Sequence, residues 1–216
     1  MKEVWKKKFY LQLLIFLVLF SLLYCDKTQA EPTWEKVTSL NSIYIKVLEP
    51  TPKGILAGEH NPGYTSGTTP VNGVFFSKDF GKTWQSLGLN NRGVLDLKYF
   101  DGKIYATTCY TIDHTNGLFL TDNMGETWQN IGPPASPTKV DRDSQTIYLG
   151  SLHYGLYTSF DEGSTWNKLF EGGSTDLRVY EVQSSEDVTL FSDLRKVYRT
   201  TDHGVTWEEV EALSNK

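Results

Sequence analysis

The sequence predicts an all-β protein made of repeated four-stranded units. Aromatic residues form 13% of the 216-residue chain, and 18 Gly stand against two Met, a composition that favours strands joined by many turns. The second observation is a tryptophan that returns about every forty residues, at Trp84, Trp128, Trp166 and Trp207. A four-stranded unit repeated at this period is typical of a propeller blade.

Each of these tryptophans closes the same phrase. The four phrases are GVFFSKDFGKTW (73–84), GLFLTDNMGETW (117–128), GLYTSFDEGSTW (155–166) and KVYRTTDHGVTW (196–207). β-branched and aromatic runs before each phrase predict first strands at 42–48, 94–100, 138–143 and 177–182, and second strands at 55–59, 103–109, 146–151 and 188–193. The phrase itself supplies a third strand and a turn, and the short run after Thr-Trp supplies a fourth, outermost strand.

Folding alone explains the shared positions of the phrase. An Asp or Asn side chain accepts hydrogen bonds from the N–H groups of a turn, and glycine adopts a positive φ at no steric cost. An indole ring packs over the hairpin and between neighbouring units. The predicted structural residues are therefore Asp79, Gly81 and Trp84, then Asn123, Gly125 and Trp128, then Asp161, Gly163 and Trp166, and finally Asp202, Gly204 and Trp207.

The pattern S-x-D-x-G-x-T-W resembles the Asp-box, or BNR, repeat. The copies at 77–84 and 159–166 match it fully, whereas the copy at 121–128 has Asn123 for Asp and the last copy has Thr200 for Ser. The repeats are similar to those of sialidases, sortilin-type domains, xyloglucan-active glycosidases and photosystem II assembly propellers, and they cover nearly all of residues 33–211. The resemblance implies a β-propeller in which the Asp-boxes lie at the periphery, away from any active site.

Two features favour a small or incomplete propeller of about four blades. Residues 33–37 copy only the tail of a repeat, so we expect an extra outermost strand there, while the C-terminal repeat already has its own outermost strand. The two ends therefore do not combine into one shared blade. The alternatives are a four-bladed ring and an open arc, and an open arc would expose apolar blade faces that favour self-association.

The N-terminus has the pattern of an export signal. Lys6, Lys7 and Lys8 precede an apolar run over 9–24, which predicts a signal peptide at 1–24, a short tether at 25–32 and the propeller domain at 33–216. The run ends on Leu-Leu-Tyr-Cys, which resembles a bacterial lipobox and makes Cys25 the candidate for lipidation. Cleavage after Ala30 and an uncleaved anchor are the rivals. All three place the domain outside the cytoplasm, either in the bacterial cell envelope as a lipoprotein or as a secreted protein.

Net charge argues against one class of partner, and the setting of Cys109 argues against one kind of catalysis. The chain carries a net charge of −5 although its N-terminal segment is basic, so the remainder is more acidic still. Such a domain has no basic surface for phosphate backbones, and we expect no nucleic-acid partner. Cys109 lies in an apolar run and is expected to be a small buried residue, not a catalytic thiol.

The sequence favours binding over catalysis. Sialidase chemistry, as the resemblance implies it, uses three Arg, a Tyr nucleophile assisted by Glu, and an Asp acid. Here no Arg precedes Arg92, the family's early Arg-Ile-Pro signature is absent from 31–60, and Arg178 with Tyr180 is the pair expected to share a strand face. A sialidase-type glycoside hydrolase remains the alternative. The acidic residues on or near the inner strands are Asp96, Asp141, Asp143 and Glu181, and their spacing selects no catalytic pair.

The same rim offers histidines, but we expect neither a metal nor a cofactor. His60, His114 and His153 follow second strands at uneven register, which is more typical of exposed loop residues than of a zinc site.

The loops between second and third strands supply the candidate binding site. Those of the first two repeats, 59–72 and 110–116, are long, and those of the last two, 152–154 and 193–195, are short. Long loops on one rim of a rigid scaffold are where binding concentrates. We expect a protein, peptide or glycan ligand there, with Asn61 and Asn116 as further hydrogen-bonding groups. The candidate ligand-binding residues are Tyr64, Tyr110, Asp113, His114, Tyr154 and Arg195.

Overall fold

A computed structural model describes residues 35–37, 39–40, 43–60, 71–111, 116–151, 153–169, 178–193 and 195–210, with the backbone alone at 110 and 111. The chain divides into two parts, residues 1–36 and 37–216. Of the first part the structure describes Glu35 and Lys36, which lie in no strand. The predicted signal peptide, Cys25 and the tether lie outside the described residues. Everything below concerns the second part.

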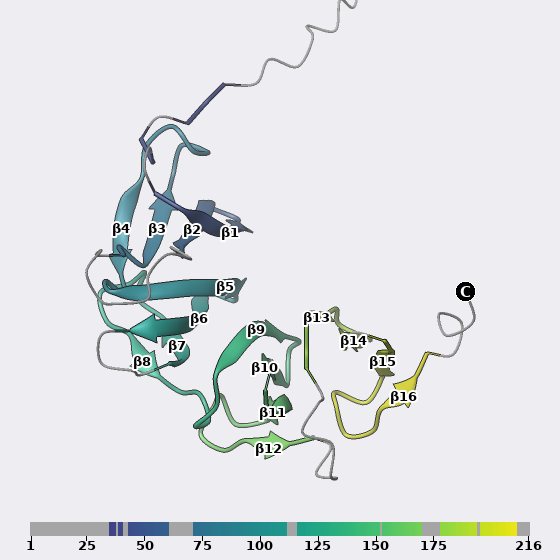
Figure 1. The fold of residues 1–216 in the computed structure, drawn as a ribbon. Helices are drawn as coiled ribbons and strands as arrows, with labels where there is room; N and C mark the ends of the chain where they lie inside the picture. The colour runs from purple at the N-terminus through teal and green to yellow at the C-terminus, as the bar shows by residue number, and fades with distance from the viewer. Residues whose placement is uncertain are drawn as a thin grey trace, which may run out of the picture. The chain divides into compact units, whose positions relative to one another are not determined.

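The second part consists of four antiparallel four-stranded sheets, which we call blades 1 to 4 (Figure 1). In each blade the strands follow one another in chain order, from the innermost to the outermost. Blade 1 contains β1 (Ile45–Thr51), β2 (Gly54–Glu59), β3 (Val74–Ser77) and β4 (Gln85–Gly88). Blade 2 contains β5 (Arg92–Phe100), β6 (Lys103–Thr111), β7 (Gly117–Thr121) and β8 (Gln129–Asn130). Blade 3 contains β9 (Pro137–Arg142), β10 (Ile147–Ser151), β11 (Gly155–Ser159) and β12 (Asn167–Lys168). Blade 4 contains β13 (Glu181–Ser184), β14 (Thr189–Ser192), β15 (Val197–Thr200) and β16 (Glu208–Glu209).

The all-β fold and the four-stranded blades confirm the fold class predicted from the repeats, with two corrections to strand limits. β1 begins and ends three residues later than expected, because Glu49, Pro50 and Thr51 continue the pairing with β2 down to a tight turn at 52–53. β13 begins only at Glu181, since residues 178–180 precede the ladder that pairs it with β14. No helix long and apolar enough to cross a bilayer occurs among the described residues.

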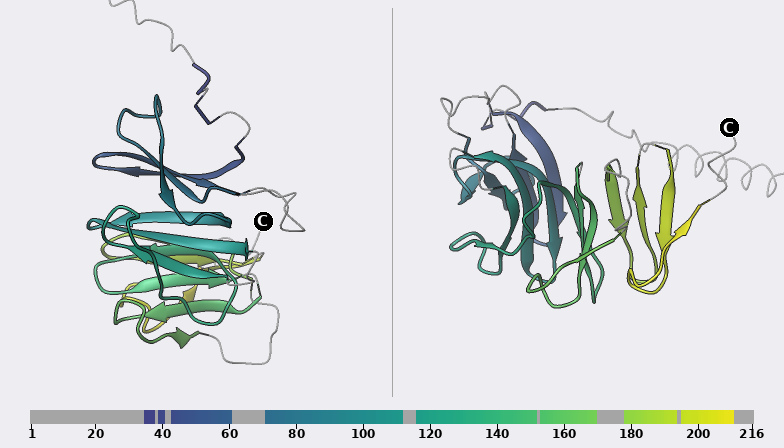
Figure 2. Two further views of the ribbon diagram at one scale, coloured as in Figure 1. Left: turned by 90° about the vertical axis from the view of Figure 1, so that its left-hand side faces the viewer. Right: turned by 60° about the horizontal axis from the view of Figure 1, so that its bottom comes forward.

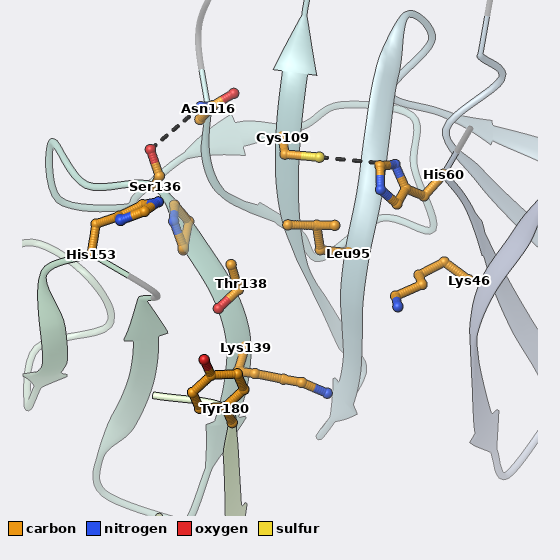
Figure 3. A pocket seen from close by; sticks show the side chains of 11 residues that line it. Lys46, His60, Leu95, Cys109, Asn116, Ser136, Thr138, Lys139, His153 and Tyr180 are labelled. Carbon is orange, nitrogen blue, oxygen red and sulfur yellow. Dashed lines mark hydrogen bonds between the residues drawn. The ribbon is translucent and has the colours of Figure 1, made fainter. Parts of the chain in front are cut away.

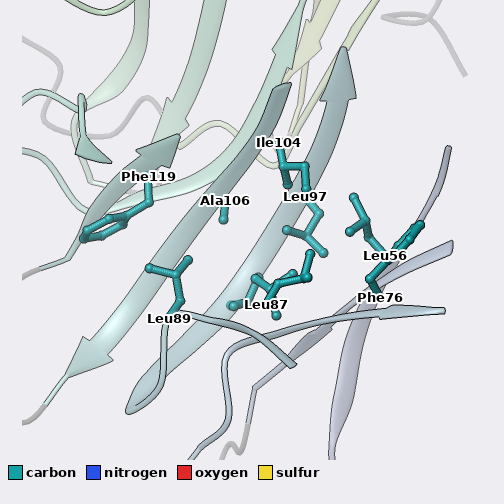
Figure 4. Close-up of a cluster of buried hydrophobic side chains, with 10 residues drawn as sticks. Leu56, Phe76, Leu87, Leu89, Leu97, Ile104, Ala106 and Phe119 are labelled. Carbon is teal, nitrogen blue, oxygen red and sulfur yellow. The ribbon is translucent and has the colours of Figure 1, made fainter. Parts of the chain in front are cut away.

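Successive blades pack face to face, and each junction has its own apolar core (Figures 1 and 2). The core between blades 1 and 2 includes Leu56, Phe76 and Leu87 from the first and Leu97 and Phe119 from the second (Figure 4). Equivalent clusters join blade 2 to blade 3 and blade 3 to blade 4. Blades 2 and 3 therefore bury one face against the blade before them and the other against the blade after them, whereas blades 1 and 4 each bury one face.

The four blades do not close into a ring. Extensive contacts join each blade to the next, and within the described residues no comparable contact joins blade 1 to blade 4. Of the two arrangements that the sequence left open, the structure has the open one. The backward face of blade 1 and the forward face of blade 4 thus have no neighbouring blade, where backward and forward mean toward the preceding and following blade.

Val37 takes part of the place of a preceding blade. A side chain built on Gly125 would meet Leu87 of blade 1, and one built on Gly163 would meet Ile131 of blade 2. Val37 stands three residues after a Thr-Trp, as Leu87 and Ile131 do, and a side chain built on Gly81 would lie 4.0 Å from it. The predicted extra strand over 33–37 is not found in the described part, because Glu35–Val37 form no ladder. Val37 nevertheless occupies the position that the tail of a preceding repeat would occupy.

Candidate functional site

The four Asp-box turns form one rim of the blades, and their polar groups hydrogen-bond to one another within each turn. In the first turn Gly81 N–H donates to Ser77 Oγ (2.7 Å), Thr83 N–H donates to Asp79 Oδ1 (2.8 Å) and Thr83 Oγ1 donates to Asp79 Oδ2 (2.6 Å). This is the hydrogen bonding that the motif predicts. The same set recurs in the third turn at Ser159, Asp161, Gly163 and Thr165 and in the fourth at Thr200, Asp202, Gly204 and Thr206. In the second turn Asn123 accepts from Thr127 N–H and donates its amide to Thr127 Oγ1.

These bonds fix the charge of the box carboxylates. Hydrogen bonds from Thr83 lower the pKa of Asp79 to about 2, and those from Thr206 do the same for Asp202. Both carboxyl groups are therefore ionised at neutral pH, and each accepts three hydrogen bonds within its own turn.

The residue between the Asp and the Gly of each box, here called the box-centre residue, bridges to the preceding blade in blades 3 and 4. All four, Phe80, Met124, Glu162 and His203, have φ between 54° and 57°. Glu162 of blade 3 contacts Lys103 Nζ (2.9 Å) and Tyr105 Oη (3.3 Å) of blade 2. His203 of blade 4 contacts Asp143 Oδ2 (3.0 Å) of blade 3. In blades 3 and 4 the left-handed conformation thus aims the box-centre side chain across the junction.

Arg142 strengthens the junction between blades 2 and 3. Its guanidinium lies 3.1 Å from Glu162 Oε1 and stacks over the Phe100 ring at 4.5 Å. Burial alone would raise the pKa of Glu162, but hydrogen bonds from Arg142 and Lys103 outweigh it and lower that pKa to about 2. The pair is therefore charged over the whole physiological range.

Carboxylates on the inner strands act as staples between blades. Each accepts the outward N–H of the next blade's innermost strand, which no strand pairs on that side. The staples join Tyr99 N–H to Glu49 (3.0 Å), Val140 N–H to Asp96 (3.1 Å) and Ser184 N–H to Asp141 (2.7 Å). Lysines on the neighbouring strands reinforce them, with Lys98 at 2.7 Å from Asp141 and Lys139 at 2.9 Å from Glu181.

Asp96 carries the largest perturbation among these staples. Burial raises the pKa of its carboxyl group to about 6, and the charge of Lys139 opposes that rise only in part. A carboxyl group with such a pKa is a candidate general acid in other settings. Here one oxygen holds the Val140 amide, and the other faces Lys139 Nζ at 4.0 Å, so both have structural partners.

The opposite rim contains a pocket of about 560 Å³ at the inner ends of blades 1 to 3 (Figure 3). Its wall comes from the beginnings of the inner strands and from the ends of the second strands and their loops. The lining residues are Lys46, His60, Leu95, Cys109, Asn116, Ser136, Pro137, Thr138, Lys139, His153 and Tyr180. Lys46 and Lys139 approach each other from opposite walls in Figure 3, and no lining residue is a carboxylate.

Cys109 and His60 form a pair in the pocket whose protonation states do not suit nucleophilic attack. Cys109 Sγ lies 3.9 Å from His60 Nδ1, but burial raises the pKa of the Cys109 thiol to about 11. Burial and then the charge of Lys46 lower the pKa of His60. At neutral pH the pair is therefore a thiol and a neutral imidazole, the reverse of the thiolate and imidazolium that a cysteine nucleophile needs.

The predicted ligand residues divide into three groups. Tyr64, Asp113 and His114 lie outside the described residues, as does the side chain of Tyr110. Tyr154 is exposed beside the pocket, with its ring 6.4 Å from that of His153. Arg195 lies in the turn between β14 and β15 and is not among the residues that line the pocket.

The structure also describes several of the residues that the sequence offered for a metal site or for sialidase chemistry. His60 and His153 line one pocket, but among the described residues no three His, Cys, Asp or Glu side chains gather as metal ligands do. The expectation that Arg178 and Tyr180 share a strand face is wrong, because both precede β13, and only Tyr180 lines the pocket.

Comparison with known proteins agrees with this geometry. Residues 75–86 match the BNR/Asp-box repeat family. A 76-residue stretch is 38% identical to the vacuolar protein sorting/targeting protein 10 of Fusarium vanettenii, covering 33% of this chain and 5% of that protein. The chain thus carries a BNR/Asp-box repeat and is similar to proteins of the Asp-box β-propeller family.

Solved structures show the same fold at low identity. An ancestral GH74 enzyme superposes with a TM-score of 0.61 at 17% identity, over 84% of this propeller chain and 26% of the enzyme. YCF48 with a D1 peptide bound superposes with a TM-score of 0.55 at 14% identity, over 83% of this chain and 57% of YCF48. The chain therefore spans less than two thirds of these relatives, and the likeness establishes the propeller fold alone.

Proposed function

We propose that this Asp-box protein is an exported, lipid-anchored and non-catalytic binding module that holds a segment of a protein or peptide in the pocket of Figure 3. The single observation that carries the proposal is the contrast between the rims. Box carboxylates and staples accept hydrogen bonds within the fold, whereas in the pocket Lys46 has no ion pair, and Asn116 Oδ1 no hydrogen-bond donor, among the described residues. A concave, mostly preformed site with few convergent polar groups is typical of ligand binding.

The pocket suits a ligand with an acidic or carbonyl group and an N–H. Lys46 has no ion pair among the described residues, while Lys139 is only partly neutralised by Glu181 and Asp96. Asn116 Oδ1 is buried and accepts no hydrogen bond from any described residue. A peptide supplies both kinds of group at once, and the bound peptide on YCF48 supports the same class of ligand. The predicted residues Tyr64, Tyr110, Asp113 and His114 would extend the site along the long loops.

Site-specific photo-crosslinking tests this function. A benzoylphenylalanine replaces Tyr180 in the pocket or, as the control, the exposed Val205 in the Asp-box turn of blade 4. We expect a defined adduct from the native membrane fraction at position 180 and none at position 205. Adducts at 205 alone would contradict the proposed face. A Tyr64→Ala, Tyr110→Ala double variant should lose the same adduct without unfolding.

The non-catalytic part of the proposal has its own test. Likeness to GH74 enzymes keeps glycoside hydrolysis as the rival function, and Asp96 is the carboxyl group closest to the right pKa. We expect no turnover of fluorogenic sialosides or other glycosides by the purified protein. Turnover that disappears in Asp96→Asn or Arg178→Ala would overturn the binding-module assignment.

The anchor is tested at Cys25. We expect labelled palmitate to be incorporated by the cells' lipoprotein pathway and to vanish in Cys25→Ser. A mature N-terminus at Glu31, with no label, would show secretion after cleavage at Ala30 instead.

A further inference from the structure

The backward face of blade 1 and the forward face of blade 4 each carry the residues that form one side of the junctions between blades. Leu48 of β1 pairs with Ala57 and corresponds in register to Leu97, Val140 and Val182, which face backward into the three junctions. Those three side chains are 3%, 3% and 1% exposed, whereas Leu48 is 60% exposed. The backward face of blade 1 therefore presents an apolar residue that every other blade buries.

The forward face of blade 4 shows the complementary exception. Leu190 pairs with Arg199 and Gln183, and its counterparts in blades 1 to 3 are Leu56, Tyr105 and Tyr148. All three counterparts are 0% exposed, because the following blade covers them, but Leu190 is 39% exposed.

The box-centre residues indicate which surface can pack against the backward face of blade 1. Glu162 contacts Lys103 and Tyr105 of the blade before it, and both contacts match in charge or hydrogen bonding. Phe80 is the box-centre residue of blade 1 and is 77% exposed. The register places Val188 and Leu190 of blade 4 at the positions of Lys103 and Tyr105. An apolar box-centre residue thus matches an apolar pair on the other end of the same chain.

The inner edge matches as well. Glu181 occupies in blade 4 the register position of Asp96, which accepts the N–H of Val140 from the next blade. The corresponding residue of blade 1 is Leu48. At the neighbouring position, where Tyr99 and Ser184 need an acceptor for their N–H, blade 1 has Pro50, which has no N–H.

We infer that the protein associates head to tail, with the forward face of blade 4 of one copy packed on the backward face of blade 1 of the next. In this contact Phe80 packs on Val188 and Leu190, and Glu181 accepts the N–H of Leu48. Val210 would lie over Gly81, as Leu87 lies over Gly125, and Val37 must move aside for it. Such a heterologous contact yields a closed ring if the rotation closes and a fibre if it does not.

Sedimentation velocity of the full chain in a mild non-ionic detergent tests the contact. We expect a mass that rises with concentration above the 24.5 kDa of one chain. Phe80→Glu should weaken association at least tenfold, on the order expected for losing a central aromatic contact. Phe80→Glu with Val188→Lys should restore it by recreating the Glu162–Lys103 pair. Val205→Glu, an exposed apolar residue in another box turn, is the matched control and should change nothing. A wild-type chain that stays monomeric, or a Phe80→Glu chain that associates normally, would overturn the inference.

Disulfide trapping keeps the test independent of those variants. Chains with Phe80→Cys and chains with Leu190→Cys, both in a Cys25→Ser background, should cross-link when mixed and not when kept apart. Cross-links within the Phe80→Cys sample alone would indicate a symmetric contact and overturn the head-to-tail arrangement.

Discussion

The Asp-box rim and the pocket rim lie at opposite ends of the same strands and are built on opposite principles. At the box rim exposed turns carry short hydrogen bonds from Thr to Asp and from Gly N–H to Ser or Thr, and the box-centre residues Glu162 and His203 bridge to the preceding blade. At the pocket rim loops of unequal length surround a hollow whose lysines, histidines and Asn116 have few partners among the described residues. The comparison teaches that repetition builds the scaffold, while departures from repetition build the site.

The largest expected effect concerns the Trp positions at the box rim. Trp166 Nε1 donates to Ile131 O of the preceding blade (2.7 Å), whereas Trp84 Nε1 reaches only Gly81 O in its own turn (3.1 Å). All four box tryptophans are half-buried. Trp166→Ala should cost about 3–5 kcal/mol in urea unfolding, as large aromatic truncations do, and Trp84→Ala clearly less. Equal losses would show that the junction does not depend on the cross-blade bond.

Two glycines with similar positive φ should differ in how much stability is lost when each is replaced by Ala. Gly125 and Gly102 have φ of +86° and +82°, but a side chain on Gly125 would come within 2.2 Å of Leu87 O, whereas one on Gly102 would meet nothing within 4 Å. Gly102→Ala should cost about 1 kcal/mol from backbone strain alone. Gly125→Ala should cost about 2–4 kcal/mol, because strain and overpacking add. If calorimetry gives the same loss for both, the blades are less tightly packed at the box rim than the structure shows.

The staples predict a dependence of stability on pH. Since the folded pKa of Asp96 is raised to about 6, this group contributes stability below the unfolded pKa, and the contribution is lost as the pH rises through about 6. Relative to Asp96→Asn, the wild-type chain should lose on the order of 2 kcal/mol between pH 4 and pH 7. The control is Asp101→Asn, in the exposed turn between β5 and β6. A difference that does not change with pH would contradict the burial of the Asp96 carboxyl group.

The smallest effect on stability is expected at the pocket. Tyr180 is partly exposed and lies outside the three apolar junction cores, so Tyr180→Ala should change the free energy of unfolding by less than about 0.5 kcal/mol. The same change should abolish or strongly weaken ligand capture. A destabilised Tyr180→Ala variant with unaltered capture would reverse the roles assigned to the two rims.

The sequence predicted the scaffold well because each scaffold residue acts within its own repeat. Asp79 accepts from a residue four positions away, and Gly81 needs its positive φ for a local turn, so one copy of the motif already states the chemistry. The repeat also predicts which rim carries the loops between second and third strands. His60, His153 and Asn116 lie on that rim, and all three line the pocket.

The rest of the site was beyond the sequence because it depends on neighbours some forty residues away. Lys46, Leu95, Thr138 and Lys139 stand on different inner strands and meet only after the blades stack. The staples have the same origin, since Asp96 and Val140 become partners only across a junction. The sequence does contain one signal of these contacts between blades. Acids and lysines alternate at register-equivalent positions of successive inner strands, as in Asp96, Lys139 and Glu181.

Native-state hydrogen exchange tests the central contrast most directly. The amides of Gly81 and Thr83, and of Gly163 and Thr165, lie in exposed turns but donate to Ser and Asp side chains within the box. The amides of His153 and Tyr154 reach only Ser151 Oγ at 3.3 Å. We expect the box amides to exchange only through opening with a free energy close to that of global unfolding, and the rim amides through local opening. Box turns that exchange as fast as His153 and Tyr154 would contradict the claim that the Asp-box rim holds the scaffold and leaves the other rim free to bind.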